Sequence, residues 1–505
     1  MRRSWLFACG VLLLVALVVR LAYIDLLDDS MSADEAVGAL MTLKIARGEE
    51  FPLMFWEASY SGTFPFLLGA VGFRLVEPSL TVLRLALLPL ALVGIAATVS
   101  TARARWGVGP ALVGGAWFAL GPPLLFAYST RAMNGYPEVL AFGGLTLWFA
   151  TRLRERPRGE ASGLWRWTLF GAVAGFGVYS FLFVLPIFAG AVWALCRARG
   201  APSRRELAAL AAGFLVGVSP FVLYNVIHPG ASVIRLGARL FDVSRSDVAG
   251  SSRLLVLAGD KAAGYIFRLV RLPATLLSNL PPALGLPGWG IWITAVVVAM
   301  SVVAARARPR PDFGLDLLGR CGLLLLLFVW GSDLDAPRHL FPFFLLVPLG
   351  IAALWACAPG WVRLVAGVGL ILVLANNVFA TAQDAHAGKP SVRELLAALD
   401  ARGVRFVYTD YAIAYPLVFL SHERVIASPA AGPTNVDRYP PYTHAVAASP
   451  CPAYVFRRGS EASAVFVREM RRVGIAFSRE ELSEFDVYVP ERHVDPHDLA
   501  LLRRF

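Results

Sequence analysis

Charged residues are scarce in this sequence, and their scarcity excludes an ordinary soluble protein. Only 16% of the 505 residues are Asp, Glu, Lys or Arg, whereas 57% are hydrophobic. The apolar residues come in blocks of about twenty, the length that crosses a hydrocarbon core of roughly 30 Å. A soluble helical protein would spread its apolar residues as periodic stripes instead. The sequence therefore predicts a membrane protein with several spans.

Cysteine is also rare, and the distribution of the five cysteines excludes a disulfide framework. Four of them lie in or beside apolar segments, where cysteine usually behaves as a small hydrophobic residue. Only Cys451 lies in the polar C-terminal part of the chain. No cluster of His, Cys or Asp has the spacing of metal ligands. We therefore expect no metal site and no cofactor.

The sequence also lacks a small-residue cleavage site before Asp25. The apolar stretch from Trp5 to Ile24 follows Arg2 and Arg3, as the apolar core of a signal peptide would. The stretch is long for a signal peptide, so we expect an uncleaved first span.

The net charge of +12 indicates how the chain is oriented in the membrane and does not indicate a nucleic-acid-binding surface. The arginines gather in short clusters between apolar blocks, and such clusters mark cytoplasmic loops. With the N-terminus in the cytoplasm, every predicted cytoplasmic loop is net basic, and an odd number of spans places the C-terminus outside. About eleven spans are predicted, at residues 5–24, 80–100, 110–127, 137–151, 165–180, 182–196, 207–227, 289–305, 318–332, 339–357 and 362–380.

Two outer loops are longer than simple connections. The first, 25–79, is acidic, and its segment 63–76 is predicted to be a surface helix that dips into or lies on the outer leaflet. Counting that segment as a span would place the loop with Arg103 and Arg105 outside. The other loop, 228–288, is basic. Its arginines are either solvated or form a surface for anionic lipid or a phosphate-linked sugar.

The composition changes near residue 384, where a second domain is predicted. Residues 1–383 form the transmembrane domain, and residues 384–505 form a small extracytoplasmic α/β domain of about 120 residues. Helices are predicted at 391–402 and 461–473, and strands at 405–408, 425–427, 452–456 and 485–489. The predicted fold class is an all-α polytopic membrane protein with a small C-terminal α/β domain.

An acidic pair, Asp34 and Glu35, directly follows the first span. A structural interpretation is that Ser32 caps a helix over 36–47 and the two acids complement its N-terminal dipole. A functional interpretation places a reactive carboxylate at the outer membrane surface. The local sequence alone leaves both open.

The motifs around this pair are similar in order to those of a membrane glycosyltransferase family. They are Leu40 to Gly48, Tyr60 to Leu67, Leu83 to Leu85, Ser129-Thr130-Arg131 and Arg338 to Pro342. This order resembles the dolichyl-phosphate-mannose–protein mannosyltransferase and aminoarabinose-transferase-like family (glycosyltransferase family 39 type), within the GT-C superfamily. The resemblance covers residues 1–160 and 325–350 by motif. The family often has an Asp in the second outer loop, where this chain has Asn134 and Glu138.

The resemblance implies a GT-C-like hexosyl- or pentosyltransferase in the cell inner membrane. Its donor would be a polyprenyl-phosphate sugar, and its acceptor a protein, lipid or glycan of the cell envelope. Asp34 is expected to be the general base, with Glu35 its less critical neighbour. Besides membrane lipids and these substrates, no partner is expected, and nucleic acid is excluded.

A cation is expected to bind the leaving phosphate. Arg338 is the first candidate, and snorkelling at the membrane interface is the competing explanation for it. Arg131 and Lys261 are weaker candidates.

Three further residues, Glu57, Tyr60 and Glu138, are candidate substrate contacts. The competing explanations are that Glu57 lies in an exposed loop and that Glu138 belongs to a helix that Pro137 begins.

The C-terminal domain is expected to support acceptor recognition or stability and to hold no catalytic residue. Tyr408, Asp410, Tyr411 and Tyr415 follow its first strand, where they either bind carbohydrate or pack in the core beside a helix cap. The rival functions for the whole chain are a transporter or flippase, and an inactive GT-C-like scaffold. A transporter places ionisable residues at the membrane midplane, whereas the predicted spans nearly lack acids in their centres.

Overall fold

The computed structural model divides the chain into two compact units. Unit 1 comprises Met1–Leu26, Ala58–Leu68 and Arg84–His386, and unit 2 comprises Leu27–Glu57, Gly69–Leu83 and Ala387–Phe505. The structure describes residues 2–28, 30–133, 135–155, 163–232, 312–330, 337–386, 392–429, 436–496 and 498–499. Lys261, the predicted span 289–305 and most of the long loop 228–288 lie outside these ranges. Unit 2 thus combines the C-terminal region with two segments of the predicted first outer loop.

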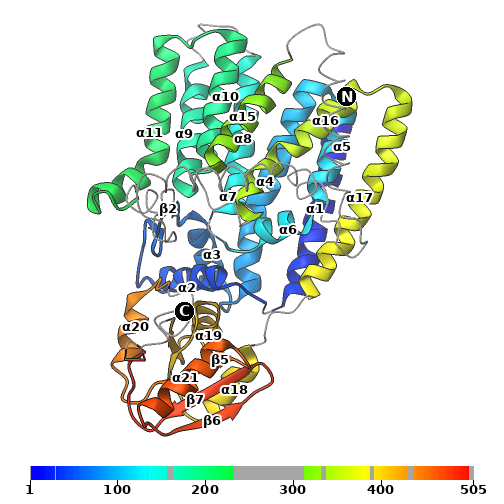
Figure 1. The fold of residues 1–505 in the computed structure, drawn as a ribbon. Helices are drawn as coiled ribbons and strands as arrows, with labels where there is room; N and C mark the ends of the chain where they lie inside the picture. The colour runs from blue at the N-terminus through cyan, green and yellow to red at the C-terminus, as the bar shows by residue number, and fades with distance from the viewer. Residues whose placement is uncertain are drawn as a thin grey trace, which may run out of the picture. The chain divides into compact units, whose positions relative to one another are not determined.

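Unit 1 is a bundle of helices (Figure 1), and ten of the eleven predicted spans coincide with described helices. These helices are α1 (Arg2–Leu27), α4 (Leu80–Trp106), α5 (Val108–Ala119), α6 (Pro123–Thr130), α7 (Tyr136–Glu138), η1 (Val139–Gly143), α8 (Gly144–Arg154), α9 (Leu164–Ser180), α10 (Val184–Arg199), α11 (Arg204–Ile227), α15 (Phe313–Trp330), η5 (Pro337–Leu345), α16 (Val347–Cys357) and α17 (Gly360–His386). Strand β2 (Ala58–Gly62) also belongs to this unit, and α3 (Phe64–Leu75) begins in it.

Several of these helices suit a membrane. Within the described ranges, four are long and apolar enough to cross one, namely Arg3–Leu27, Leu80–Trp106, Arg204–Ile227 and Gly360–Ala385. Two bent pairs raise the number to six if each is one span: α5 with α6, bent by 76°, and η5 with α16, bent by 41°. The total of eleven spans stays a prediction.

Glycines allow α9 and α11 to pack closely along their length (Figure 1). A Cβ atom added at Gly213 of α11 would lie 1.9 Å from the Thr168 carbonyl oxygen of α9. One added at Gly171 of α9 would lie 2.1 Å from the Leu210 carbonyl oxygen of α11. Small residues at these positions bring the two backbones together, as is common between helices in membranes.

A buried arginine stabilises the sharp bend between α5 and α6. Arg20 of α1 is fully buried, and its guanidinium donates to the carbonyl oxygens of Phe118 and Ala119 at the C-terminal end of α5. The same group donates to the Ser129 hydroxyl at 3.3 Å and lies over the Phe126 ring of α6. A cation at a helix C-terminus satisfies carbonyls that lack helical partners. Arg20 therefore has a structural explanation.

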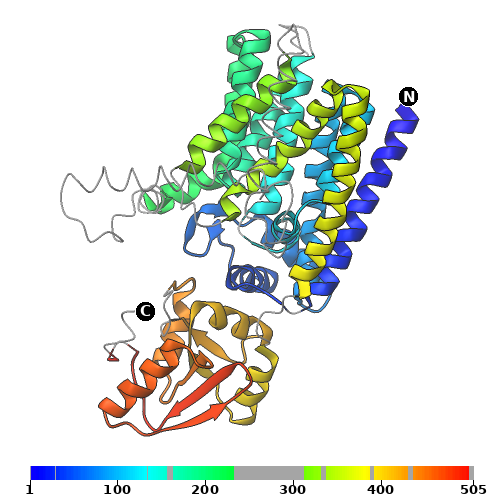
Figure 2. The same ribbon diagram turned by 45° about the vertical axis from the view of Figure 1, so that its right-hand side comes forward.

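Unit 2 contains a five-stranded mixed sheet and the helices around it (Figure 2). The order is β4-β3-β5-β7-β6, in which β3 pairs parallel with β4 and β5, and β7 pairs antiparallel with β5 and β6. The strands of this sheet are β3 (Phe406–Tyr408), β4 (Ile426–Ser428), β5 (Ala453–Arg457), β6 (Phe477–Glu481) and β7 (Phe485–Pro490). Strand β1 (Met54–Phe55) also belongs to unit 2 but lies outside this sheet. The helices are α2 (Ala33–Arg47), α18 (Val392–Ala401), α19 (Tyr411–Leu420), α20 (Pro440–Ala447) and α21 (Glu461–Arg472).

The predicted fold class is confirmed, because the structure is mostly helical with a small C-terminal sheet. Every helix and strand predicted for the C-terminal region is present, and α19, α20 and β6 are additional. The core around the sheet joins strand residues such as Tyr454 and Tyr488 to Phe466 of α21.

Candidate functional site

The acidic pair lies in the first turn of α2, as its structural interpretation predicts. The Ser32 side chain accepts a hydrogen bond from the Glu35 backbone N–H at 3.2 Å, so Ser32 is the N-cap. Gly48 ends the helix in the left-handed conformation, with φ of 74°. Asp34 and Glu35 therefore face the positive end of the helix dipole. The capping arrangement is confirmed, and it leaves a further role for either acid open.

The two acids of the pair differ in their surroundings. The Glu35 side chain is fully buried, whereas the Asp34 side chain keeps 23% of its surface exposed. A group that takes a proton from a substrate must be reachable from outside the protein. Asp34 meets this condition in the structure.

Two side chains from the C-terminal region hold the Asp34 carboxylate. The Tyr411 hydroxyl, at the start of α19, donates to Asp34 Oδ1 at 2.5 Å. The Arg438 guanidinium places Nη2 3.5 Å from the same oxygen and donates from Nε to the Tyr411 hydroxyl at 3.2 Å. Burial and then the negative charge of Asp34 raise the pKa of Tyr411 well above its ordinary value. The phenol therefore stays protonated and remains a donor.

Arg438 is itself held from several directions. Its backbone N–H donates to the Tyr415 hydroxyl at 2.6 Å, and its guanidinium lies 5.6 Å from the centre of the Phe55 ring. Nη1 donates to the carbonyl oxygen of Glu57 at 3.2 Å. The Glu57 backbone has a positive φ of 55°, and its side chain is exposed, as the exposed-loop interpretation predicted. Arg438 thus links Asp34 to the turn at Glu57.

A second polar cluster in unit 2 lies at the opposite end of α2. Glu423 forms ion pairs with Lys44, at 3.3 Å, and with Arg47, and it accepts a hydrogen bond from the Tyr442 hydroxyl at 2.6 Å. Burial disfavours the charged carboxylate, but the Tyr442 hydrogen bond and the two cations outweigh it and lower the pKa of Glu423.

Aspartate 410 has the capping role that one sequence interpretation predicted. Its side chain accepts from the Ile413 backbone N–H at 3.0 Å and begins α19. Tyr411 therefore occupies the first helical position, and α19 packs against α2. Tyr408 and Tyr415 are buried in the core.

Four other candidate residues belong to unit 1, where an aromatic cluster brings their segments together. Phe341 of η5, three residues after Arg338, contacts the Tyr136 ring of α7 at 5.3 Å and the Tyr128 ring of α6 at 5.9 Å. Phe181 contacts Tyr136 at 5.2 Å and Tyr60 of β2 at 6.3 Å. The segments that carry Tyr60, Arg131, Glu138 and Arg338 therefore meet around these rings.

Glu138 is the most unusual of these residues. Its side chain is fully buried, and among the described residues neither carboxylate oxygen has a hydrogen-bond partner. Pro137 lies in the first turn of α7, as expected for a residue that begins a helix. The π-helix η1 follows, and such segments often accompany functional sites. A buried polar group without a partner is rare in proteins, so Glu138 remains a functional candidate.

Arg131 and Arg338 differ in burial. Arg131 is the C-cap of α6 and is buried, with its charge near the Tyr23 hydroxyl. Arg338 is half-buried in η5.

Comparison with solved structures shows that the chain has a known fold. No family model and no curated protein matches the chain. A crystal structure of ArnT from Cupriavidus metallidurans bound to undecaprenyl phosphate matches with a TM-score of 0.62 and 15% identity, over 95% of this chain and 97% of that chain. Its apo structure matches with a TM-score of 0.60 and 15% identity, over 97% and 98%. This chain has an ArnT-like fold.

The oligosaccharyltransferase of Archaeoglobus fulgidus, in complex with zinc and sulfate, matches with a TM-score of 0.50 and 12% identity. The match covers 88% of this chain and 68% of that chain. ArnT is an aminoarabinose transferase, and both proteins are GT-C glycosyltransferases. The resemblance that the sequence predicted is therefore confirmed at the level of the fold.

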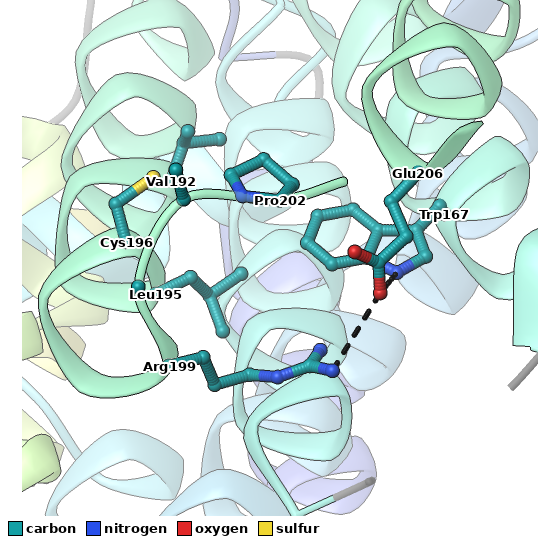
Figure 3. Close-up of a pocket in the computed structure, with 9 residues that line it drawn as sticks. Trp167, Val192, Leu195, Cys196, Arg199, Pro202 and Glu206 are labelled. Atoms are coloured by element: carbon teal, nitrogen blue, oxygen red, sulfur yellow. Dashed lines mark hydrogen bonds and ion pairs between the residues drawn. The ribbon is translucent and has the colours of Figure 1, made fainter. Parts of the chain in front are cut away.

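Unit 1 also contains a pocket between α9, α10 and α11, and none of the predicted site residues lines it (Figure 3). Glu206 in this pocket accepts from the Trp167 indole at 3.1 Å and pairs with Arg199 at 3.6 Å. Glu206 also completes a capping box with Ser203 at the start of α11. The polar groups of this pocket are therefore explained by the contacts that join the three helices.

In the part of the chain that the structure describes, no three His, Cys, Asp or Glu side chains lie close enough to hold a metal ion.

No sequence pattern marks Arg438 as a site residue, and at Tyr411 the sequence indicates only a carbohydrate contact or a core residue. Arg438 lies 404 positions from Asp34 along the chain, and no local pattern indicates a contact over that separation. The sequence did contain one relevant signal: Asp410 was recognisable as a helix cap, and a cap at position 410 fixes Tyr411 as the first residue of the helix.

Proposed function

We propose that this protein is a membrane glycosyltransferase that moves a sugar from a polyprenyl-phosphate donor to an acceptor outside the cytoplasm. The observation that carries the proposal is Asp34, an accessible carboxylate held by Tyr411 and Arg438 within a chain of ArnT-like fold. The ArnT structure that matches this chain binds undecaprenyl phosphate, which supports a lipid-phosphate donor.

The proposed reaction is a displacement at the anomeric carbon of the donor sugar. The hydroxyl oxygen of the acceptor forms a bond to that carbon, and its proton passes to the Asp34 carboxylate. The bond between the anomeric carbon and the phosphate oxygen breaks, and its electron pair leaves with the polyprenyl phosphate. Because the lipid tail stays in the bilayer, the sugar is presented at the membrane surface, where a base just beyond the first span would meet it.

The leaving phosphate needs a cation to stabilise its developing charge. Arg338 is the proposed ligand, since a guanidinium binds two phosphate oxygens through parallel hydrogen bonds. Arg131 is the second candidate, and Lys261 lies outside the described residues. Glu138, Tyr60 and Glu57 are proposed substrate contacts. The buried, unpartnered carboxylate of Glu138 supports a polar ligand in unit 1.

The proposed location is the cell inner membrane, with the N-terminus in the cytoplasm and the C-terminal region outside. The net basic charge of every predicted cytoplasmic loop supports this topology. Labelling of single cysteines by a membrane-impermeant reagent tests it. Cysteines placed near Arg105 and Arg205 should be protected in intact cells, and a cysteine near Asp400 should react.

One assay separates the proposed function from its rivals. Purified protein is reconstituted in vesicles with a radiolabelled polyprenyl-phosphate sugar and a panel of protein, lipid and glycan acceptors. Transfer of label to one acceptor class supports the glycosyltransferase and names its acceptor. Movement of labelled lipid between leaflets without transfer would indicate a flippase. If neither occurs with any donor, the inactive scaffold is the better description.

A further inference from the structure

We propose that Tyr411 and Arg438 are positioning residues for Asp34, so that the C-terminal region completes the catalytic site. The inference rests on the proposed function, since it assigns these two side chains a task in the same reaction. It goes further by giving the C-terminal region a part in catalysis that the sequence did not predict.

The two oxygens of Asp34 are not equivalent in the structure. Both Tyr411 and Arg438 contact Oδ1. Oδ2 has no hydrogen-bond partner among the residues that the structure describes, and the Asp34 side chain is partly exposed. One oxygen is therefore held by protein donors, while the other is left to accept a proton from a substrate hydroxyl.

The donors themselves are well fixed, as a positioning role requires. Tyr411 occupies the first turn of α19, which the Asp410 cap begins and which packs against α2. The Arg438 side chain is only 7% exposed, and the Tyr415 hydroxyl binds its backbone. Each donor is thus held by a different part of the C-terminal region. Together they restrict the rotation of the Asp34 side chain.

Arg438 also couples Asp34 to the turn at Glu57. Its three guanidinium nitrogens have three different partners: Nε the Tyr411 hydroxyl, Nη1 the Glu57 carbonyl and Nη2 the Asp34 carboxylate. Lysine carries one nitrogen and cannot reproduce this pattern. Arg438→Lys should therefore behave more like Arg438→Gln than like the native protein.

The test is a set of single and double variants assayed for transfer at saturating and limiting donor. Tyr411→Phe removes only the hydroxyl that reaches Asp34. Tyr442→Phe is the matched control, because it removes a buried hydroxyl of the same unit that donates to Glu423 instead. We expect Tyr411→Phe to lower kcat by about 10-fold to 100-fold with KM changed less than about twofold, since misplacing a reacting group slows chemistry rather than binding. Tyr442→Phe should stay within about threefold of the native rate.

The Asp34→Asn background shows whether Tyr411 acts through Asp34. If it does, Tyr411→Phe should cause no further loss once Asp34 is replaced, since coupled residues are not additive. Independent, multiplicative losses would overturn the inference. So would a native rate for Tyr411→Phe.

The outcomes also separate this inference from the proposed function. If Asp34→Asn is fully active, the proposed function of Asp34 fails. If Asp34→Asn is inactive while Tyr411→Phe and Arg438→Gln are normal, the function stands and the inference falls. Thermal unfolding of each variant identifies loss of folding, and Arg438→Lys is the second variant at that position should Arg438→Gln not fold.

Discussion

Trp56 and Tyr439 stack with their ring centres 4.2 Å apart and their planes 25° from parallel. The first residue lies in the predicted first outer loop and the second in the C-terminal region, and both belong to unit 2. The Tyr439 hydroxyl also donates to Glu50. Segments from the two ends of the chain therefore share one core, and disrupting either should weaken both.

Truncation of Trp56 tests this shared core. Trp56 is buried, so Trp56→Ala should cost about 3 to 5 kcal/mol of stability, as large-to-small substitutions of buried aromatic residues do. Trp56→Phe keeps a ring on Tyr439 and should cost less. Thermal unfolding in detergent, with proteolysis of the first outer loop followed in parallel, measures both. An unchanged unfolding midpoint in Trp56→Ala would contradict the shared core.

Replacement of Asp34 and Glu35 separates catalysis from helix capping. If both acids only complement the helix dipole, each contributes about 0.3 to 1 kcal/mol, and Asp34→Asn should work almost normally. If Asp34 is the general base, Asp34→Asn should insert and fold normally but transfer sugar about 100-fold more slowly. Glu35→Gln should keep more activity than Asp34→Asn. The measurement is turnover at matched expression, and loss of activity in Glu35→Gln alone would assign the base to Glu35.

Substitutions of Arg338 test the proposed phosphate ligand. Arg338→Ala should weaken use of the lipid-linked donor more than Arg338→Lys, because lysine keeps the charge but not the two-point hydrogen bonding. Interface snorkelling predicts little effect from either change. Arg363→Ala, which removes an exposed arginine from α17, is the control for general loss of charge. The quantity to compare is kcat/KM for the donor. If both Arg338 variants keep the native value, Arg338 does not bind the phosphate.

Acidification should destabilise unit 2 through Glu423. Its pKa in the folded protein is below the ordinary value of 4.5, so its ion pairs stabilise the fold fully above that pH. The contribution should be lost as the pH falls from 4.5 through the folded-state value. Glu423→Gln should be less stable at neutral pH and should show a smaller further loss on acidification. Glu491→Gln, at an exposed glutamate, should unfold as the native protein does at each pH. Parallel acid profiles for Glu423→Gln and the native protein would show that Glu423 does not contribute.

The helices of unit 1 were predictable because a membrane span appears in the sequence as a continuous block of apolar residues. Structure between those blocks was harder to foresee. The 76° bend between α5 and α6 interrupts one predicted span, and its stabilising residue, Arg20, lies in another helix. The sequence of α1 does not indicate that Arg20 binds the carbonyl oxygens at the C-terminal end of α5.

The elements that were missed in unit 2 lack a clear amphipathic pattern. Helix α19 is apolar on nearly all sides and contains Pro416, so neither helical periodicity nor propensity marks it. Strand β6 lies at the edge of the sheet and is largely exposed, and its residues do not alternate between polar and apolar. Tertiary packing, rather than local sequence, determines both.

The candidate site shows the same division between local and long-range information. Ser32 as the cap of α2 and Asp410 as the cap of α19 follow local rules and were predictable. The pairing of Asp34 with Arg438 follows from the fold as a whole. Glu138 was noted for its position in the chain, and only the structure shows its burial without a partner.

The separation of 377 positions between Asp34 and Tyr411 has a consequence for biosynthesis. A ribosome makes the first outer loop early, and domains fold as their residues emerge. The held carboxylate cannot form until translation has passed Arg438 and the C-terminal region has met the first loop. A chain released early from the ribosome would carry Asp34 but not the two side chains that contact it. Synthesis of the C-terminal region would therefore act as a checkpoint on the proposed activity.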